Sequence, residues 1–168
     1  LIFHAPTRGL MGYTSRFLTL TKGTGVINRI FHSYGEYTGD MEGRRNGALI
    51  SMENGKAVAF AIFNLQARGE MFVTHNDPVY EGMIVGLSSK SGDLEINVLK
   101  GKKLTNVRAA GSDGLTSLTP PIKMSLEEMM SYVNEDELLE VTPKNLRLRK
   151  KLLLAHERKK QLRETLTA

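Results

Sequence analysis

The chain has 168 residues, with 23 lysines and arginines against 18 aspartates and glutamates, four histidines and no cysteine. Its length fits one or two domains, and a chain of this size can bury a core without covalent staples. The lack of cysteine excludes a disulfide scaffold, a cysteine-ligated zinc site, an iron–sulfur cluster and a thiol nucleophile. Apolar residues make up 40% and charged residues 24%, the usual composition of a folded protein.

The first residues carry neither a basic stretch nor a long apolar run, so they predict no signal peptide and no transmembrane helix. Residues 1–5 have the pattern of the middle of a strand, and we expect the chain to be the C-terminal piece of a longer protein. Residues 8–21 have helical apolar spacing, residues 23–25 suit a glycine-based helix exit, and residues 26–34 favour a strand. This order predicts half of a split βαβ unit.

The segment after Gly39 has the turn-rich pattern of a β domain. Asn54-Gly55 lies between the apolar residues 48–52 and 57–63, and Asn-Gly between two apolar runs favours a type I′ hairpin turn. Three more strands are expected at short intervals: residues 71–74, 83–88 and 94–99. Several short strands with glycine-rich turns indicate a small barrel or sandwich.

A helix and a hairpin are predicted toward the C-terminus. Ser125 and Glu128 have the spacing of a capping box, which predicts a short helix that ends near Tyr132. Residues 138–141 and 146–148 then favour two paired strands joined by a Thr-Pro-Lys-Asn turn.

Charge is distributed unevenly along the chain. Residues 143–168 hold nine basic and two acidic residues, a net charge of +7, which leaves −2 for residues 1–142. Strand alternation places Arg147 and Arg149 on one face, and residues 152–166 predict a basic terminal helix. Two interpretations stay open at this point: a tail that faces a polyanion, and a solvated, charged helix end.

No complete active site is visible in the sequence. Phosphate-loop, nucleophile-elbow, zinc-protease and dinucleotide-binding motifs are absent. The four histidines lack ligand spacing, and residues 75–78 are interpreted as an Asn-Asp-Pro turn rather than a metal site. Glu81 and Asp93 would act as paired carboxylates only if the fold brought them together.

The segment from Lys100 to Gly114 is the most informative part of the sequence. It holds four cations, an amide and hydroxyl groups, with small residues in place of bulky apolar anchors. A connection of this length after a strand is usually functional or disordered. Lysine and arginine neutralise phosphates, and Asn106 and Arg108 can reach base edges or 2′-hydroxyls. A nucleic-acid contact and a solvated basic loop both fit this composition.

Ordered motifs across nearly the whole chain resemble one family. Residues 101–109, Gly-Lys-Lys-Leu-Thr-Asn-Val-Arg-Ala, followed by residues 111–113, Gly-Ser-Asp, resemble the signature loop of the BipA/TypA translational GTPases. Residues 8–12 and 21–25 resemble the helix and exit of that family's elongation-factor-G-like domain V. Five stretches resemble its special C-terminal domain: residues 45–51, 55–60, 66–69, 79–86 and 136–143. Departures from the family pattern are residues 75–78, Ala110 in place of a common serine, and the variable tail after Leu152.

The resemblance implies an α+β fold. A partial split βαβ unit, like half of the ferredoxin-like domain V of elongation factor G, would precede a β-rich, small barrel-like domain with short helices. The implied domains are residues 1–38, a truncated domain V; residues 39–150, the BipA/TypA-type C-terminal domain; and residues 151–168, a basic tail helix. The GTPase domain is absent from this chain. We therefore expect no enzymatic activity and no cofactor here, since GTP and Mg²⁺ belong to that missing domain.

The resemblance also implies a function, the ribosome-binding region of a cytoplasmic, ribosome-associated monomer without membrane contact. The implied partners are the 50S subunit, 23S rRNA and the acceptor end of A-site tRNA. The whole protein would act in stress or cold-adapted translation and in 50S assembly. The expected RNA-binding residues are Lys56, Arg44, Arg45, Lys100, Lys102, Lys103, Thr105, Asn106, Arg108, Arg147 and Arg149. The alternative is a protein-interaction or structural module whose basic tail only keeps it soluble.

Overall fold

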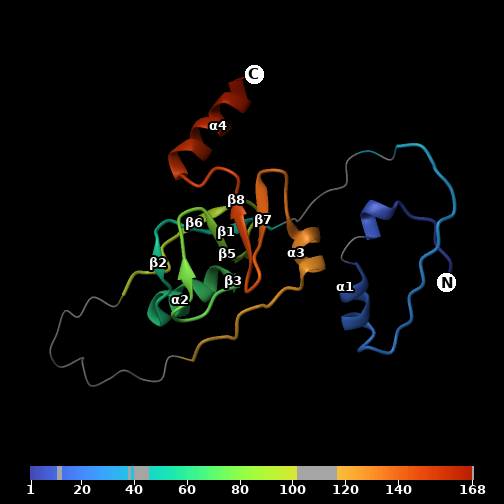
Figure 1. The fold of residues 1–168 in the computed structure, drawn as a ribbon, viewed down its shortest axis with the longest axis horizontal. Helices are drawn as coiled ribbons and strands as arrows, with labels where there is room; N and C mark the ends of the chain where they lie inside the picture. Colours follow the sequence, from blue (N-terminus) through green and yellow to red (C-terminus); the bar gives the residue numbers. More distant parts are fainter. Residues whose placement is uncertain (11–12, 38, 40–45, 102–116, 168) are drawn as a thin grey trace.

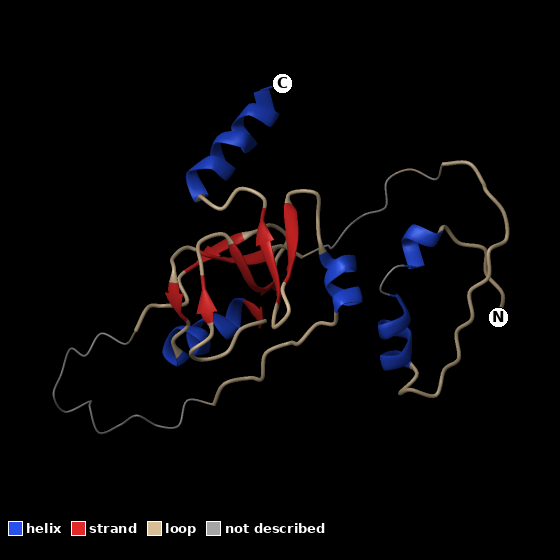
Figure 2. Ribbon diagram, viewed as in Figure 1, coloured by secondary structure: helices blue, strands red, loops and turns tan. Residues whose placement is uncertain are grey.

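The structure is a computed structural model that describes residues 1–10, 13–37, 39, 46–101 and 117–167 (Figure 1). It is mixed α+β, as predicted (Figure 2). The described helices are η1 (Thr7–Leu10), α1 (Tyr13–Leu20), α2 (Ala59–Leu65), η2 (Gln66–Arg68), α3 (Leu126–Tyr132) and α4 (Ala155–Thr167). The described strands are β1 (Ala48–Ser51), β2 (Gly55–Lys56), β3 (Gly69–Met71), β4 (Pro78–Val79), β5 (Met83–Ser88), β6 (Leu94–Ile96), β7 (Glu137–Val141) and β8 (Leu146–Lys150).

The strands form an open sheet in the order β6-β1-β5-β8-β7, with β3 also paired to β5 and a small β2-β4 ladder beside it. β1 and β6 are parallel, and the other pairs are antiparallel. The expected barrel is therefore not closed among the described residues. Closure requires the two end strands of the sheet to pair, and here the path ends at β6 and β7.

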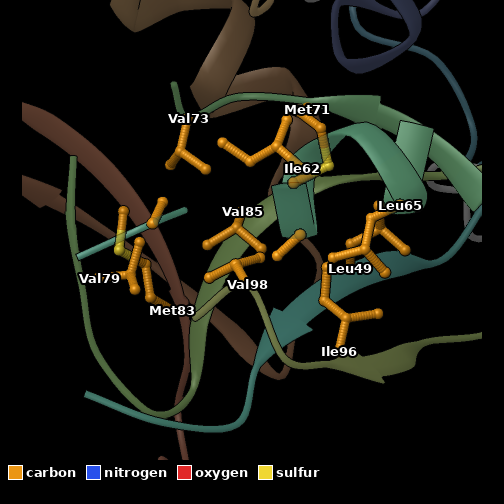
Figure 3. Close-up of a cluster of buried hydrophobic side chains, with 12 residues drawn as sticks. Leu49, Ile62, Leu65, Met71, Val73, Val79, Met83, Val85, Ile96 and Val98 are labelled. Carbon is orange, nitrogen blue, oxygen red and sulfur yellow. The ribbon is translucent and has the colours of Figure 1, made fainter. Parts of the chain in front are cut away.

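Two apolar clusters cover the two faces of this sheet. Successive side chains of a strand point to opposite faces, so β1 sends Leu49 into one cluster and Ile50 into the other. Ile62 of α2 closes the first cluster against Val85 (Figure 3). Met129 of α3 closes the second. We call residues 46–101 and 117–154, which contain both clusters, the sheet body.

The hairpin predicted around Asn54-Gly55 is wrong. β1 pairs with β5 and β6, whereas Gly55 lies in β2, which pairs with β4. Its φ of 159° is close to extended, not the left-handed value that a type I′ turn needs. The apolar run 57–63, expected as a strand, instead leads into α2, which buries Ala61, Ile62 and Leu65 on one helix face. Its apolar spacing therefore serves a helix packed on the sheet.

Residues 1–37, which we call the N-terminal segment, contain the predicted helix but not the predicted strands. α1 ends at Leu20, and Gly23, with φ +78°, provides the expected exit. Residues 1–5 and 26–34 have no regular structure. A strand is stabilised by hydrogen bonds from a neighbouring strand, and none of the described residues pairs with these stretches. The predicted domain boundaries stay a prediction.

The C-terminal elements agree closely with expectation. Ser125 Oγ accepts from Glu128 N at 3.3 Å and Glu128 Oε2 accepts from Ser125 N at 2.8 Å, which confirms the capping box. β7 and β8 form the predicted hairpin, with Leu139 opposite Leu148. α4 follows as the basic terminal helix and leads away from the sheet (Figure 1). Among the described residues, no helix is both long and apolar enough to span a membrane.

Candidate nucleic-acid interface

The basic segment that resembles the family's signature loop is connected at both ends to the same core. Leu99 precedes it and Leu118 follows it, and both pack against the cluster that α2 closes. Leu99 N donates to Asn97 Oδ1 at 2.9 Å, and Ile122 N donates to Met71 O at 2.9 Å. We call residues 97–101 the entry stem and residues 117–122 the exit stem. Both stems are thus held by the sheet body.

Two predicted RNA-binding residues lie in or next to the entry stem. Lys100 lies within it, and Lys56 lies in β2, where the Leu99 side chain fills the space beside Gly55. Both lysines are exposed. Val58 N donates to Val98 O at 2.9 Å, which ties the chain after β2 to the same stem. The structure therefore places two solvated cations where the basic segment begins.

Most of the other predicted contacts cannot be placed. Lys102, Lys103, Thr105, Asn106 and Arg108 lie outside the described residues. Arg44 and Arg45 also lie outside them. Their role in RNA binding stays a prediction.

Arg147 and Arg149 lie on β8, and Arg149 is half-buried against an acidic side chain. Arg149 Nε is 2.9 Å from Glu140 Oε1, and Tyr80 Oη donates to Glu140 Oε2 at 2.7 Å. Burial, the hydrogen bond and the Glu140 charge raise the pKa of the Tyr80 hydroxyl. Arg147 pairs with Glu140 in the strand register. Glu140 offsets the Arg149 charge, so this face offers less positive charge than the sequence suggests.

A buried lysine is the main electrostatic feature that the sequence did not reveal. Lys150 is 2% exposed. Its Nζ lies 2.5 Å from Asp93 Oδ2, 2.7 Å from Asp136 Oδ2 and 3.0 Å from Glu137 Oε1. Burial alone would lower the pKa of its ammonium, but the hydrogen bonds to Asp136, Asp93 and Glu137 outweigh burial and raise it. The cluster joins β8 to β7 and to the turn before β6. The cluster serves the fold, because the Lys150 ammonium is enclosed by the three carboxylates.

The two carboxylates considered as a catalytic pair have different partners. Asp93 contacts Lys150 and accepts from Ala48 N at 2.7 Å. Glu81 accepts from Ala155 N at 3.3 Å, at the start of α4. Neither arrangement resembles an acid–base pair.

Residues 75–78 form the expected turn. Thr74 N donates to Asp77 Oδ2 at 2.8 Å, and Asn76 adopts a left-handed φ of 68°. Within the described ranges, no group of three or more histidine and carboxylate side chains could hold a metal ion.

The basic tail is attached to the sheet body by its first turn. Arg158 Nη2 is 3.0 Å from Glu95 Oε1, and Arg158 Nη1 donates to Leu152 O at 3.0 Å. Further along α4, Lys159 is 66% and Lys160 is 79% exposed. Lys159 Nζ is 3.7 Å from Glu95 Oε2, and Lys160 Nζ is 3.9 Å from Glu164 Oε1. Arg158, the less exposed of the three, therefore does most to position the helix, whereas the two lysines are largely open to solvent.

Comparisons with known proteins agree with the resemblance. The sequence model of the family described as "TypA/BipA C-terminal domain" matches residues 46–155. A Salmonella typhimurium protein named "Large ribosomal subunit assembly factor BipA" is 50% identical over 156 residues, 92% of this chain and 26% of that protein. Proteins of the same name from Escherichia coli K12, 49% identical over 156 residues, and Haemophilus influenzae, 48% identical over 161, match to the same 26% of their length.

The chain thus spans about a quarter of the length of these curated relatives. The part that the family model matches starts just before β1 and ends at the first residue of α4, so it contains both apolar clusters and both stems. On this evidence the chain belongs to the TypA/BipA family, and residues 46–155 are its C-terminal domain.

Proposed function

We propose that this chain binds the large ribosomal subunit through RNA, and that the face around the two stems is the contact surface. The observation that carries the proposal is that both stems rest on one core while Lys56 and Lys100 are exposed beside the entry stem. The segment between the stems adds three cations in sequence, Lys102, Lys103 and Arg108. The names of the relatives, large ribosomal subunit assembly factors, support the choice of partner.

The finer assignment follows the family resemblance. In this proposal the basic segment reaches large-subunit rRNA and the acceptor end of A-site tRNA, while the sheet body fixes its position. The protein is then cytoplasmic and associated with ribosomes, and the whole protein acts in subunit assembly and in translation under stress or cold.

GTP hydrolysis is assigned to a domain outside this chain, because the sequence contains no phosphate loop to enclose a triphosphate. We therefore expect the purified chain to neither hydrolyse nor bind GTP specifically. Saturable binding of GTP at micromolar concentration, measured by calorimetry, would contradict this assignment.

The test compares two sets of cations by sedimentation with purified large subunits at several salt concentrations. The variant Lys102→Ala/Lys103→Ala/Arg108→Ala should fold normally and bind more weakly. Losing three phosphate contacts should lower the magnitude of the log–log salt slope by roughly 2–3 units. Circular dichroism checks the fold.

The matched control removes tail cations, Lys159→Ala/Lys160→Ala, and leaves Arg158 in place because it positions α4. It should change binding less than the triple variant. Loss of binding in the tail variant alone would move the contact surface to α4. Binding that barely responds to salt would favour the alternative, a protein-interaction module with a solubilising tail.

A further inference from the structure

Helix α2 lies between the two stems. At its start, Val58 N donates to Val98 O of the entry stem at 2.9 Å. At its end, Gln66 Nε2 donates to Thr119 O of the exit stem at 3.4 Å. Leu99 of the entry stem and Leu118 of the exit stem pack on the same cluster as Ile62 and Leu65 of α2. The outer face of α2 therefore lies between the entry stem and the exit stem.

Two phenylalanines occupy this outer face. Phe60 is 38% and Phe63 is 47% exposed. They are three residues apart, so they are neighbours on one side of the helix. Ile62 and Leu65 point the other way, into the core (Figure 3). The core is closed without the two phenylalanine rings, which are left facing solvent.

The three segments that frame α2 are basic in sequence. Residues 54–68, 97–101 and 117–123 frame α2 and contain four basic residues and no acidic one: Lys56, Arg68, Lys100 and Lys123. All four are exposed. Glu53, just outside the frame, accepts from Asn97 Nδ2 at 2.8 Å. Asp77, whose backbone oxygen accepts from Ala57 N at 2.9 Å, has its carboxylate engaged by Thr74 N at 2.8 Å. The exposed charges of the three framing segments are thus basic and suit a polyanion.

We propose that Phe60 and Phe63 form a stacking surface for unpaired RNA bases, with Lys56, Arg68 and Lys100 on the adjoining phosphates. Aromatic rings stack on bases of any sequence, and a surrounding set of cations follows the backbone. The four exposed basic residues of the frame favour a polyanionic partner over an uncharged apolar one. The inference rests on the proposed function and deepens it, because it adds a contact on the described sheet body to the one expected from the basic segment.

The test uses the full chain and a fluorescently labelled hexacytidylate, an RNA without base pairs, with anisotropy measured at several salt concentrations. Phe60→Leu/Phe63→Leu should weaken binding about tenfold with an unchanged salt slope, since stacking is lost and no charge is removed. Phe60→Tyr/Phe63→Tyr should bind like the wild type because tyrosine keeps the aromatic face. Lys56→Ala/Lys100→Ala should lower the magnitude of the slope by about 1.4.

The matched control is Phe3→Leu/Phe31→Leu, which removes two exposed aromatic rings, 79% and 73% exposed, from the N-terminal segment. It should leave oligonucleotide binding unchanged. If circular dichroism shows that the α2 double variant is unfolded, Phe63→Leu alone, at the more exposed position, is measured instead. It should weaken oligonucleotide binding by a smaller factor, again with an unchanged salt slope.

Two results would overturn the inference while leaving the proposed function intact. The first is a wild-type chain that sediments with large subunits but does not bind the oligonucleotide. The second is an α2 variant that loses subunit binding but keeps oligonucleotide binding, which would assign the surface to a protein. Conversely, the chain could bind the oligonucleotide through Phe60 and Phe63 but fail to sediment with subunits. This result would refute the large subunit as the partner and support the stacking surface.

Discussion

The sheet body and the N-terminal segment contain similar side chains but differ in what those side chains bury. Ile50 in β1 is 2% exposed, whereas Ile30 is 91% exposed. None of the residues before Gly47 whose exposure the structure describes is buried. Both regions nevertheless contain helices, and only the sheet body contains strands.

The difference shows how a helix and a strand depend on their surroundings. A helix satisfies its backbone hydrogen bonds within itself, so α1 forms in a segment without a buried core. A strand makes its backbone hydrogen bonds with a neighbouring strand instead. β5 has three partners, β1, β3 and β8, whereas residues 26–34 have none among the described residues. The following four pairs of variants test this contrast by denaturant unfolding of the full chain.

The largest expected effect is at the buried lysine. Lys150→Met leaves Asp93, Asp136 and Glu137 close together without their ammonium group, and breaking a buried ion pair from one side typically costs about 3–5 kcal/mol. Lys22→Met, at an exposed position of the N-terminal segment, should change the free energy of unfolding by no more than about 0.5 kcal/mol. Similar midpoints for the two variants would mean that the cluster does not hold the sheet together.

The second pair compares the same substitution in and out of the core. Ile50→Ala should destabilise the protein by about 2–5 kcal/mol, because it removes apolar volume from the cluster under α3. Ile30→Ala should have an effect within about 0.5 kcal/mol. A cost above about 1 kcal/mol at Ile30 would show that the N-terminal segment buries this residue in solution.

The third pair compares two glycines. A Cβ at Gly69 would lie 1.9 Å from the backbone oxygen of Leu87, on the paired strand β5, and this backbone cannot move aside without loss of pairing. Gly69→Ala should cost about 1–3 kcal/mol. At Gly35 nothing lies within 4 Å, so Gly35→Ala should be nearly neutral. Equal unfolding midpoints would contradict this β3 register.

The smallest effect concerns pH. The raised pKa of Tyr80 in the folded state means that its contribution to stability is present below the ordinary value of 10.0 and is lost as the pH rises above it. Tyr80→Phe should therefore flatten the alkaline fall in stability. We expect about 0.5–1 kcal/mol of difference near pH 11, since this half-buried site is partly screened by solvent.

Tyr34→Phe, 95% exposed in the N-terminal segment, is the matched control and should leave the pH profile unchanged. The fall in stability above pH 10.5 that comes from Lys150 remains in both tyrosine variants, because its ammonium also has a raised pKa in the folded state. Identical profiles for wild type and Tyr80→Phe would refute the role given to the Tyr80–Glu140 hydrogen bond.

Two other glycines correct an expectation drawn from the Asn-Gly pattern, that Gly55 is held in a left-handed turn. A side chain there would meet the end of Leu99, which can rotate away, whereas Gly92 has a left-handed φ of +94° in open space. The strain from a β-branched residue is therefore expected at Gly92, not at Gly55.

Local interactions within a few residues were readable from the sequence. The capping box at Ser125, the β7–β8 hairpin and the bounds of β5 all came out as predicted, because their hydrogen bonds or turn residues lie close together in the chain. The family was also readable, since ordered motifs at matching spacing identify it without any knowledge of contacts. Of the predicted site, Lys56 and Lys100 are exposed in or next to the entry stem, and the role of every predicted site residue in RNA binding stays a prediction.

Only the tertiary structure decided what depends on residues far apart in sequence. Residues 59–65 form a helix because, as a helix, they bury Ala61, Ile62 and Leu65 against the apolar sheet face made by β1 and β5. Lys150 became buried because Asp93 is brought to it from 57 positions earlier in the chain. The Phe60–Phe63 surface lies between the two stems because Val98 and Thr119 bind opposite ends of α2. A sequence pattern specifies which face of an element is apolar, but the partner that covers this face is chosen by packing across the whole chain.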